Sequence, residues 1–428
     1  MLDLRLIRTS PDAVRAGLAR RGAAEHLDAI IDLDRDARQI RTQVEEARAE
    51  RGRLSKAIGM GKRDGADTSA DEALARELGD RLSDLEARLA DLETRRDDLL
   101  IELPNLPEEE TPDGGEDDAV ELRRVGRPAT LDPVRDHVEI AEAMGGLDFD
   151  QAAKISGARF AYLIGPIARL QFALISFVVD RVEREGFTPV VPPVMVREEA
   201  MYGTGFFPTD RASIYALADD DLFLVGTSEV PLAGLGLDRI FSDDELPLRV
   251  AGVSSCFRRE AGAAGRDTRG IFRMHQFDKV EMFSFVDAED SRDEHRRILA
   301  VEEGILGDLG IPYRVVDIAL GDLGAPAARK FDCEAWIPSQ ERYREVTSCS
   351  NCTDYQARRL RARVKGSGGT RLVHTLNGTA VAVGRTIIAL LENHQQPDGT
   401  VAVPSVLVEH GAPAVLGASS GGASDRPG

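Results

Sequence analysis

The chain has 428 residues, enough for two or three domains, and its 42% hydrophobic and 30% charged residues exclude a wholly disordered chain. No apolar run approaches the roughly 18 residues that span a bilayer, the start Met1-Leu2-Asp3 lacks the features of a signal peptide, and the four cysteines favour a cytoplasmic protein without a disulfide framework. The net charge of −20 argues against non-specific binding to nucleic acid but does not exclude a local basic strip.

Two stretches near the N-terminus carry apolar residues at alternating three- and four-residue steps, which is the pattern of a coiled-coil seam. The first stretch contains Ile30, Leu33, Ala37, Ile40, Val44, Ala47, Leu54 and Ile58, and the second contains Leu78, Leu82, Leu85, Leu89, Leu92 and Leu99. Glycines and short polar residues separate the stretches and should end the first helix. We therefore predict an N-terminal domain, 1–103, in which helices at about 28–60 and 71–102 form a long antiparallel coiled-coil hairpin. On this pattern alone, a dimerising coil or a helical bundle is an equal alternative.

The segment that follows is acidic, with 14 acids and 4 bases between Pro104 and Asp150. Residues 104–130 are predicted to be a linker, because prolines stop the helix and the composition is typical of flexible chain. Short β-branched runs at 187–191, 248–253, 280–285 and 313–318 then alternate with helices near 172–185, 291–306 and 354–364. This predicts an α+β domain over 131–410, built on a largely antiparallel sheet with flanking helices. The Gly-, Ala- and Ser-rich residues 411–428 are expected to form a disordered tail.

A loop rich in glycine and arginine lies between two of the predicted strands. It begins at Arg258 and contains Gly262, Gly265, Arg266, Asp267, Thr268, Arg269 and Gly270. Arginine is a planar, permanently charged partner for phosphate, so this loop predicts a polyphosphate site. The alternative is a solvated surface loop.

Three motifs resemble the signature motifs of the class II aminoacyl-tRNA synthetases, and they occur in the same order. Residues 186–193, Gly-Phe-Thr-Pro-Val-Val-Pro-Pro, resemble motif 1. Phe257-Arg258-x-Glu260 with its loop resembles motif 2, and Gly384-Arg385 at the start of an apolar helix resembles motif 3. The hairpin, Thr227-Ser228-Glu229 and the segments 345–352 and 376–379 narrow the resemblance to bacterial seryl-tRNA synthetases, over essentially residues 1–410.

The resemblance implies a role in ATP binding for each matched residue. Arg258 should bind the α-phosphate together with the serine carboxylate, and Arg385 should bind the γ-phosphate; these are the two expected catalytic residues. Glu260 should accept a hydrogen bond from the adenine amino group, while Phe277 stacks on the ring. The other expected ATP-binding residues are Arg259, Met274, Glu345, Val346, Thr347 and Ser348. Glu345 and Ser348 should also bind the Mg²⁺ that accompanies ATP, since this cation prefers oxygen ligands.

The implied serine pocket contains Thr227, Ser228, Glu229, Arg258, Glu281 and Thr379. Thr379 stands where many relatives carry serine, so its methyl group should narrow the pocket. A capping or surface role is the alternative for a lone Thr or Glu at a strand end.

Cys349-x-x-Cys352 has the spacing of a zinc or redox motif, but the sequence has no second such pair, and we expect no zinc.

The resemblance also gives the hairpin a function, because in this family the arm lies along the long variable arm of tRNA(Ser). The arginines expected to contact RNA phosphates are Arg35, Arg38, Arg41, Arg48 and Arg53. A solvated coil face laced with ion pairs is the alternative interpretation, since acidic residues intervene.

The resemblance implies a cytoplasmic, homodimeric serine–tRNA ligase that uses L-serine, ATP and Mg²⁺. It should form seryl-adenylate and then transfer serine to the 3′-terminal adenosine of tRNA(Ser), with tRNA(Sec) as a further expected substrate. A class II synthetase for another amino acid, such as threonine, is one alternative. A degenerate, non-catalytic binding protein with a coiled-coil arm is another, although Arg258, Glu260, Glu281 and Arg385 are all present.

Overall fold

The computed structural model describes residues 1–261, 267 and 269–417, which form two compact units, Met1–Leu106 and Pro107–Gly428. Gly262, Gly265, Arg266 and Thr268 of the Gly- and Arg-rich loop lie outside the described residues, as do residues 418–428 of the expected tail. No helix in the described ranges is both long enough and apolar enough to span a membrane.

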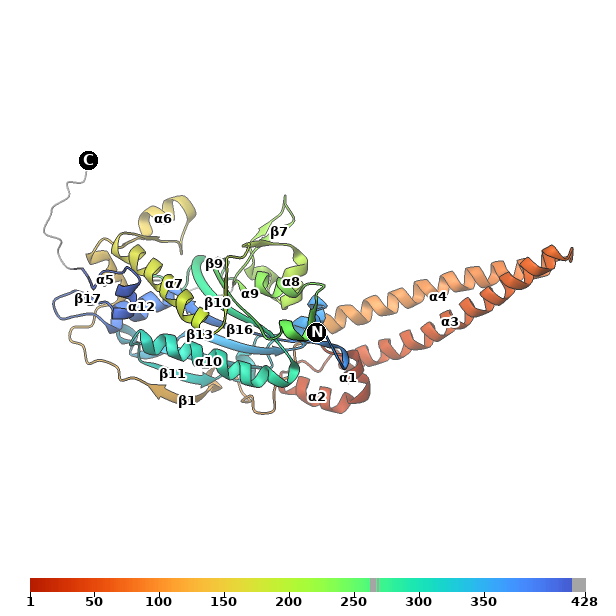
Figure 1. Ribbon diagram of the computed structural model, residues 1–428, viewed down its shortest axis with the longest axis horizontal. Coiled ribbons are helices and arrows are strands. Elements are labelled where there is room, and N and C mark those ends of the chain that lie inside the picture. The colour runs from red at the N-terminus through yellow and green to blue at the C-terminus, as the bar shows by residue number, and fades with distance from the viewer. Residues whose placement is uncertain (262–266, 268, 418–428) are drawn as a thin grey trace. The chain divides into compact units, whose positions relative to one another are not determined.

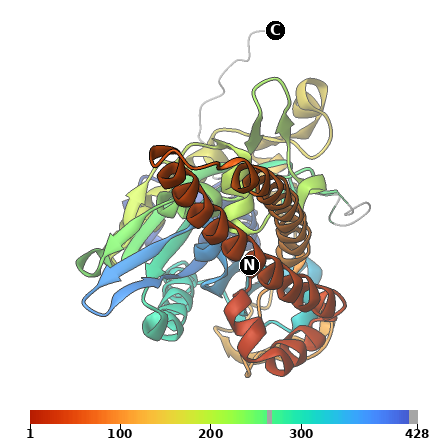
Figure 2. The same cartoon turned by 90° about the vertical axis from the view of Figure 1, so that its right-hand side faces the viewer.

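The first unit is all-helical and is dominated by an antiparallel hairpin of two long helices (Figures 1 and 2). Its helices are α1 (Leu4–Thr9), α2 (Pro11–Arg20), α3 (Leu27–Arg63) and α4 (Ser69–Glu102). The predicted hairpin is confirmed, but its first helix extends beyond the expected end at about residue 60. Helix α3 continues through Gly59 and Gly61 to Arg63, and Lys62 in its last turn pairs with Glu72 of α4 at 2.7 Å. Contacts across the hairpin therefore outweigh the low helix propensity of glycine, about 1 kcal/mol per residue.

Apolar side chains fill the hairpin seam, and ion pairs flank it. Ala37, Ile40, Val44, Ala47, Leu82 and Leu92 form its buried cluster. Arg41 pairs with Glu93, and Arg48 pairs with Glu86 at 2.6 Å, in the same register as the Lys62–Glu72 pair. A second cluster at the base of the hairpin joins the short helices to the long ones and contains Ile7, Val14, Leu18, Leu27, Ile30, Leu100 and Leu103.

A buried charge cluster separates these two apolar regions. Asp34 is only 3% exposed and accepts hydrogen bonds from Arg8 at 2.6 and 2.7 Å, while Arg96 of α4 lies 3.5 Å away. Burial opposes ionisation of Asp34, but the Arg8 hydrogen bonds and nearby positive charges lower its pKa. Arg96, which interrupts the apolar stripe of α4, thus faces a carboxylate inside the seam.

The second unit is built on a long, mostly antiparallel sheet, as predicted (Figure 1). Among the described residues, eight strands pair in the order β1, β11, β12, β13, β16, β10, β9, β4, and only β4 and β9 run parallel. Their bounds are Val120–Val125 (β1), Thr188–Val190 (β4), Leu248–Phe257 (β9), Gln276–Val286 (β10), Tyr313–Asp317 (β11), Arg329–Ile337 (β12), Arg342–Thr353 (β13) and His374–Ala382 (β16).

Helices and small sheets surround this main sheet. The helices are α5 (His137–Ala143), α6 (Phe149–Ser156), α7 (Pro166–Arg184), α8 (Glu198–Thr204), α9 (Glu229–Ala233), α10 (Ser291–Asp308), α11 (Tyr355–Leu360), α12 (Val383–Asn393) and α13 (Ser405–Glu409). The minor strands are β2 (Leu147–Asp148), β3 (Tyr162–Leu163), β5 (Met195–Val196), β6 (Ala216–Leu217), β7 (Leu222–Leu224), β8 (Ile240–Ser242), β14 (Arg363–Gly366), β15 (Gly369–Leu372), β17 (Val401–Ala402) and β18 (Val415–Leu416).

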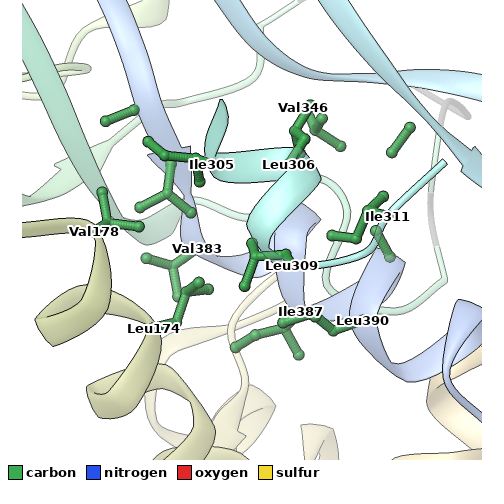
Figure 3. Close-up of a cluster of buried hydrophobic side chains, with 14 of the residues drawn as sticks. Leu174, Val178, Ile305, Leu306, Leu309, Ile311, Val346, Val383, Ile387 and Leu390 are labelled. Atoms are coloured by element: carbon green, nitrogen blue, oxygen red, sulfur yellow. The ribbon is translucent and has the colours of Figure 1, made fainter. Parts of the chain in front are cut away.

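The main core lies between one face of the sheet and helices α7, α10 and α12 (Figure 3). Leu174 and Val178 come from α7, Ile305 and Leu306 from α10, and Ile387 and Leu390 from α12. Helix α10 approaches β16 very closely at Gly378, where a Cβ atom would lie 2.2 Å from the side chain of Ile298. With this face packed by helices, polar residues that alternate with the core residues must face the opposite side of the sheet.

Three segments differ from the sequence-based expectation. The helix expected at 354–364 ends at Leu360, because Arg361 adopts a left-handed conformation and Arg363 begins β14. Residues 120–125 of the expected linker form β1, which pairs with β11. Val415 and Leu416, within the expected tail, form β18, and Leu416 is only 1% exposed. Backbone pairing with β11 holds the exposed β1 in place, whereas burial of Leu416 helps to hold β18.

Candidate active site

Two neighbouring cavities open on the face of the sheet opposite α10. The first is lined by Arg258, Glu260, Ile271, Phe272, Arg273, Met274, Phe277, Lys279, Glu345, Val346, Thr379, Ala382, Gly384 and Arg385. The second is lined chiefly by Asp210, Thr227, Glu229, Arg258, Lys279, Glu281, Lys330, Glu345, Ser348, Asn377 and Thr379. Arg258, Lys279, Glu345 and Thr379 line both cavities, so they stand where the two meet.

Strand β10 supplies one wall through simple alternation. Phe277, Lys279 and Glu281 face the cavities, while Val280 and Met282 enter the core on the other face. Arg258, at the end of the neighbouring strand β9, donates from Nε to the carbonyl of Gly226 at 3.1 Å, and its guanidinium lies 5.3 Å from the centre of the Phe277 ring. The hydrogen bond and the ring hold the guanidinium at the junction of the cavities.

Strand β13 supplies the opposite wall through a β-bulge. Thr347 pairs with Cys333 and Glu345 with Glu334, so Val346 has no partner across the ladder. Val346 packs in the core (Figure 3), and Thr347 donates to Glu302 of α10 at 2.9 Å. Two consecutive residues therefore face α10, which allows Glu345 and Ser348 to face the cavities together.

Glu345 and Arg385 are joined across this wall. Arg385 Nη1 lies 3.2 Å from Glu345 Oε1 and also donates to the Glu345 carbonyl at 3.2 Å. Burial opposes ionisation of Glu345, but the positive charges of Arg385, Lys330 and Arg258 outweigh it and lower the pKa of this carboxyl. The first cavity thus contains three arginines, Arg258, Arg273 and Arg385, together with the carboxylate of Glu345, a set suited to a phosphate chain with a cation.

Glu260 is held in an unusual conformation at the entrance of the Gly- and Arg-rich loop. Its φ of 53° lies in the left-handed region, which costs a non-glycine residue about 1 kcal/mol or more. Arg273 donates to its carboxylate and so fixes where that carboxylate points. Strain of this kind at a cavity wall indicates a function for the side chain.

The second cavity is rich in carboxylates, with Asp210, Glu229 and Glu281 in its lining. Glu281 forms an ion pair with Lys279 and accepts a hydrogen bond from Thr379 at 3.4 Å. Glu229 has no ion pair in the part of the chain that the structure describes, and burial, reinforced by the charge of Glu281, raises its pKa to about 7. Its backbone N–H donates to the Thr227 hydroxyl at 3.2 Å. Such a pocket fits a small ligand that carries both a cationic group and a hydroxyl.

Most of the residues expected from the sequence thus line the two cavities, but three of them line neither one. Arg259 places its guanidinium 5.9 Å from the centre of the Tyr215 ring, and Ser228 donates to the Gly252 carbonyl at 3.1 Å. Thr347 faces α10, as described above.

The structure adds residues to which the sequence analysis gave no role. Phe272 contacts two guanidiniums, those of Arg344 at 3.8 Å and Arg385 at 4.7 Å from its ring centre. Lys279 and Asn377 line the second cavity. Side chains alternate along a strand, so the positions of Phe277 and Glu281 could have identified Lys279 as a residue on the same face. The contact of Arg344 with Phe272 is revealed only by the fold.

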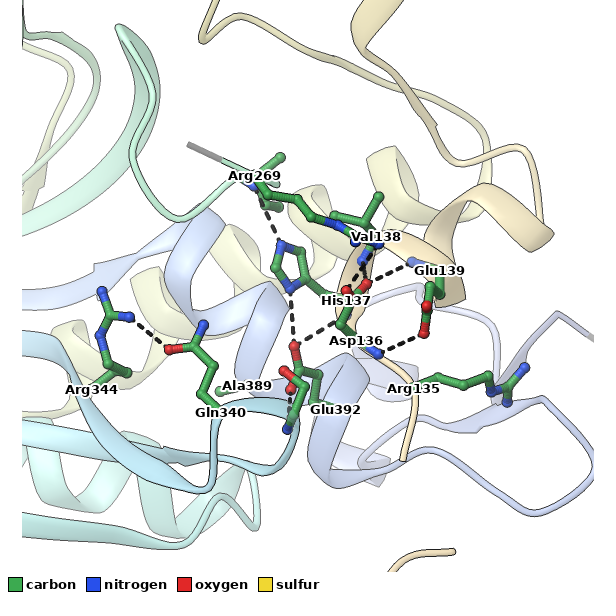
Figure 4. Close-up of polar contacts among 12 residues, drawn as sticks. Arg135, Asp136, His137, Val138, Glu139, Arg269, Gln340, Arg344, Ala389 and Glu392 are labelled. Carbon is green, nitrogen blue, oxygen red and sulfur yellow. Dashed lines mark hydrogen bonds and ion pairs between the residues drawn. The ribbon is translucent and has the colours of Figure 1, made fainter. Parts of the chain in front are cut away.

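A polar network connects the base of the Gly- and Arg-rich loop with α12 (Figure 4). His137 donates from Nδ1 to Glu392 of α12 at 2.9 Å, and its Nε2 accepts from the N–H of Ile271 at 3.4 Å. Asp136 pairs with Arg269 at 3.0 Å. Gly270 has a φ of +77°, and a Cβ atom there would lie 2.0 Å from His137 Nε2, so only glycine fits. The loop base is therefore fixed relative to the helix that carries Arg385.

The oxygen atoms near Ser348 suit a hard cation. Asp332 lies opposite Ser348 in the ladder, and its buried Oδ1 has no hydrogen-bond partner within the described residues. Burial raises the pKa of Asp332. Considering only the described residues, no group of three or more His, Cys, Asp or Glu side chains is arranged to hold a metal by itself.

Cys349 packs in the core and Cys352 lines the second cavity, so the two thiols occupy opposite faces of β13.

The arginines of the hairpin are mostly engaged within the first unit. Arg35 pairs with Asp32 at 2.8 Å, Arg38 with Asp34 at 3.2 Å, and Arg41 and Arg48 with acids of α4. Arg53 is exposed and has no ion pair among the described residues. The more exposed pairs, those of Arg35, Arg41 and Arg48, contribute about 0–1 kcal/mol each, so a polyanion can compete for these three arginines.

Comparison with known proteins identifies both units. Residues 1–107 match the family model described as seryl-tRNA synthetase N-terminal domain. Residues 215–394 match the model described as tRNA synthetase class II core domain (G, H, P, S and T).

Individual relatives cover nearly the whole chain. The serine–tRNA ligase of Acidothermus cellulolyticus is 48% identical over 412 residues, which is 96% of this chain and 98% of that protein. The crystal structure of seryl-tRNA synthetase from Pyrococcus horikoshii complexed with ATP superimposes with a TM-score of 0.92 at 41% identity, covering 97% of this chain and 99% of that one. The cytoplasmic serine–tRNA ligase of Naegleria fowleri in complex with AMP has a TM-score of 0.88 at 33% identity, covering 97% of this chain and 98% of that one.

Proposed function

The chain belongs to the seryl-tRNA synthetase family, and we propose that it activates L-serine with ATP and transfers the seryl group to the 3′-terminal adenosine of tRNA(Ser). The observation that carries this proposal is the position of Arg258 at the junction of two cavities, one rich in cationic and aromatic groups and one rich in carboxylates. A guanidinium there can bind the α-phosphate and the serine carboxylate together.

ATP occupies the first cavity in this proposal. The adenine ring stacks on Phe277 beside Met274, and Glu260 accepts from its amino group. Arg385, at the start of α12, binds the γ-phosphate, and the backbone of residues 346 and 347 borders the nucleotide. Arg259 contributes through its charge at the cavity rim, since its side chain is directed towards Tyr215.

Glu345 and Ser348 would hold Mg²⁺, because a carboxylate and a hydroxyl on one strand face supply hard oxygen ligands. The unpartnered Oδ1 of Asp332, opposite Ser348, supports a cation at this position. The ion neutralises charge on the phosphates when it is bound.

Serine occupies the second cavity. Glu229, without an ion pair in the described residues, receives the ammonium group, while Glu281 and Thr379 contact the hydroxyl. Ser228 supports the pocket from behind through its bond to Gly252. The serine carboxylate is ionised near pH 7, so no protein base is needed to generate the nucleophile. Its oxygen attacks the α-phosphorus, pyrophosphate leaves, and catalysis rests on orientation and charge stabilisation by Arg258.

The hairpin binds the tRNA. Arg35, Arg38, Arg41, Arg48 and Arg53 would exchange carboxylate partners for RNA phosphates, reading shape rather than sequence. Because such contacts do not read bases, we include tRNA(Sec) as a second substrate.

The protein is proposed to be a cytoplasmic homodimer. All four cysteines are free and buried, in keeping with a reducing compartment. Phe172 on α7 and Val191 after the edge strand β4 are 64% and 88% exposed, and we infer that they belong to one association surface. The partner on this surface is a second copy of the chain.

Pyrophosphate exchange into ATP, measured with each amino acid in turn, tests the proposed reaction. Serine alone should support exchange, and charging of tRNA(Ser) should follow. Exchange with threonine instead would indicate a synthetase of another specificity. A folded protein that exchanges with none would indicate a non-catalytic binding protein.

A further inference from the structure

A buried amide holds the carboxylate of Glu229 from behind the serine pocket. Gln356 of α11 is fully buried and belongs to neither cavity lining, yet its Nε2 donates to Glu229 Oε1 at 2.7 Å. Asn377 Nδ2 donates to the same oxygen at 3.0 Å. A carboxylate oxygen has two in-plane lone pairs, so these two N–H groups saturate Oε1.

The orientation of the Gln356 amide follows from its other neighbours. Its Nε2 also donates to the Thr204 carbonyl at 3.1 Å, and its Oε1 accepts from the Thr375 hydroxyl at 2.8 Å. A flipped amide would place its oxygen against the Thr204 carbonyl and Glu229, which are both acceptors. The hydrogen bonds to Thr375 and Thr204 therefore fix the orientation of the Gln356 amide, with its NH₂ group towards Glu229.

We propose that Gln356 is a positioning residue for substrate recognition, which saturates Oε1 of Glu229 and leaves Oε2 as the single oxygen that exchanges a proton for the ammonium group of the amino acid. This inference rests on the proposed function, with serine in the second cavity. Glu229 Oε2 binds a proton in the empty pocket, and the proton is released to solvent when the ammonium N–H takes its place. No bond other than this O–H bond is broken.

Charged groups on several elements bias this exchange. Burial and Glu281 of β10 raise the pKa of Glu229 to about 7, while Gln356, Lys279 of β10 and Arg258, just after β9, act in the opposite direction. Cys352 of β13 also faces Glu229, but burial raises the pKa of its thiol, which keeps it neutral. Serine binding should accordingly weaken as pH falls through about 7, because the neutral carboxyl cannot pair with an ammonium ion.

Replacement of Gln356 should move this pH dependence. Gln356→Met keeps the side-chain length but removes an N–H that favours the ionised carboxylate, so the pKa of Glu229 should rise further. A hydrogen bond to a charged group corresponds to a shift of about one pH unit or more. The acid limb of kcat/KM for serine should move up by that amount. KM for ATP, and kcat at pH 9 with saturating serine, should stay within about twofold. Thr375→Val, which frees the amide to turn, should give a smaller shift in the same direction.

The experiment measures serine-dependent pyrophosphate exchange from pH 5.5 to 9 for the full-length wild type, Gln356→Met and Thr375→Val. Tyr355→Phe is the matched control, since Tyr355 lies on the same helix and its hydroxyl accepts from Arg359 rather than contacting Glu229. Calorimetry with a non-hydrolysable seryl-adenylate analogue, in two buffers of different ionisation enthalpy, counts the protons released on binding. This count does not depend on turnover and applies to any folded variant.

A wild type without serine-dependent exchange would contradict the proposed function itself. A wild type that exchanges with serine, but whose acid limb is unchanged in Gln356→Met, would overturn the inference. So would a KM for serine that rises equally at every pH, or an equal shift in Tyr355→Phe, since either result means that Gln356 only supports the fold.

Discussion

Arg385 and Glu345, which are assigned to the γ-phosphate and to Mg²⁺, form an ion pair with each other at 3.2 Å in the ligand-free protein. The pair holds both side chains in the cavity, where each charge compensates the other. When Mg·ATP binds, each partner gains an opposite charge from the ligand. Nucleotide and cation should therefore bind best together.

Glu345→Gln should separate the contribution of Glu345 to Mg²⁺ binding from its effect on the binding of ATP by Arg385. Without the carboxylate, Arg385 is free for phosphate, so Mg²⁺-free ATP should bind severalfold more tightly, while the Mg²⁺ concentration needed for exchange rises by about tenfold or more. Calorimetric titration with ATP, with and without Mg²⁺, measures both effects. Glu334→Gln is the control, because Glu334 lies opposite Glu345 in the ladder but pairs with Arg314. Unchanged Mg²⁺ dependence would remove Glu345 from the cation site.

Arg258→Ala should abolish adenylate formation while the fold survives. The variant loses charge-assisted hydrogen bonds to the transition state, which typically costs about 10²–10³-fold or more in rate. Pyrophosphate exchange and a thermal melt measure activity and folding. The control Arg361→Ala removes an exposed arginine that pairs with Asp238 and should leave the exchange rate unchanged. Near wild-type exchange in Arg258→Ala would exclude this residue from the mechanism.

Shortening the hairpin should spare adenylate formation and impair tRNA charging. Residues 42–92 can be replaced by a short flexible linker, since Arg41 and Glu93 already contact one another and the apolar base of the hairpin remains. Exchange should stay within about twofold, whereas charging at physiological salt should fall by roughly 10²-fold as phosphate contacts are lost. Charging by the intact protein should also weaken as salt rises. Unchanged charging by the shortened protein would leave the hairpin as a structural coil.

Val191→Asp should shift the protein from dimer towards monomer. A charge in the middle of an apolar contact cannot be solvated once the surface is covered, so the dimer dissociation constant should rise by about tenfold or more. Sedimentation velocity over a concentration series measures this constant. Ile240→Asp changes a side chain that is 54% exposed elsewhere and serves as the control. Equal dimerisation by Val191→Asp and wild type would place the interface on another surface.

Glu302→Gln should change how stability depends on pH. Burial raises the pKa of Glu302 well above its usual value of 4.5, so above pH 4.5 the folded protein retains a proton that the unfolded chain releases. Wild-type stability is therefore reduced as pH rises, by up to about 1.4 kcal/mol per pH unit until the folded pKa is reached. The free energy of unfolding of Glu302→Gln should therefore lack this decrease with rising pH, because glutamine does not ionise.

Urea unfolding of the wild type and Glu302→Gln at pH 5, 6, 7 and 8 would measure the difference. Glu289→Gln, at an exposed position before the same helix, should follow the wild type. Parallel pH profiles of wild type and Glu302→Gln would show that Glu302 does not hold a proton in the folded protein.

The sequence predicted those parts of the fold that depend on local pattern. The heptads gave the hairpin, but Asp34 could not be identified as a buried residue, because its partners Arg8 and Arg96 come from other helices. The strand after α11 was missed because Arg361 ends that helix in a left-handed conformation, which arginine seldom adopts.

In the candidate site too, local motifs identified some residues, and only the fold identified the others. Arg258, Glu281 and Arg385 are recognisable from short motifs, and the fold brings them to one face of the sheet. Phe272 and Gln356 carry no local signal, since each matters only through side chains far away in the chain: Arg344 for Phe272, and Glu229 for Gln356.

The bulge at Val346 has a consequence for engineering this strand. Upstream of it, odd-numbered Glu345 faces the cavities; downstream, even-numbered Ser348, Ser350 and Cys352 do so. β13 thus behaves as two half-strands of opposite phase. A combinatorial library that imposed one uniform polar–apolar alternation along it would bury one half of the site while exposing part of the core. Variants of β13 must reverse their pattern at residue 346, or be confined to one side of it.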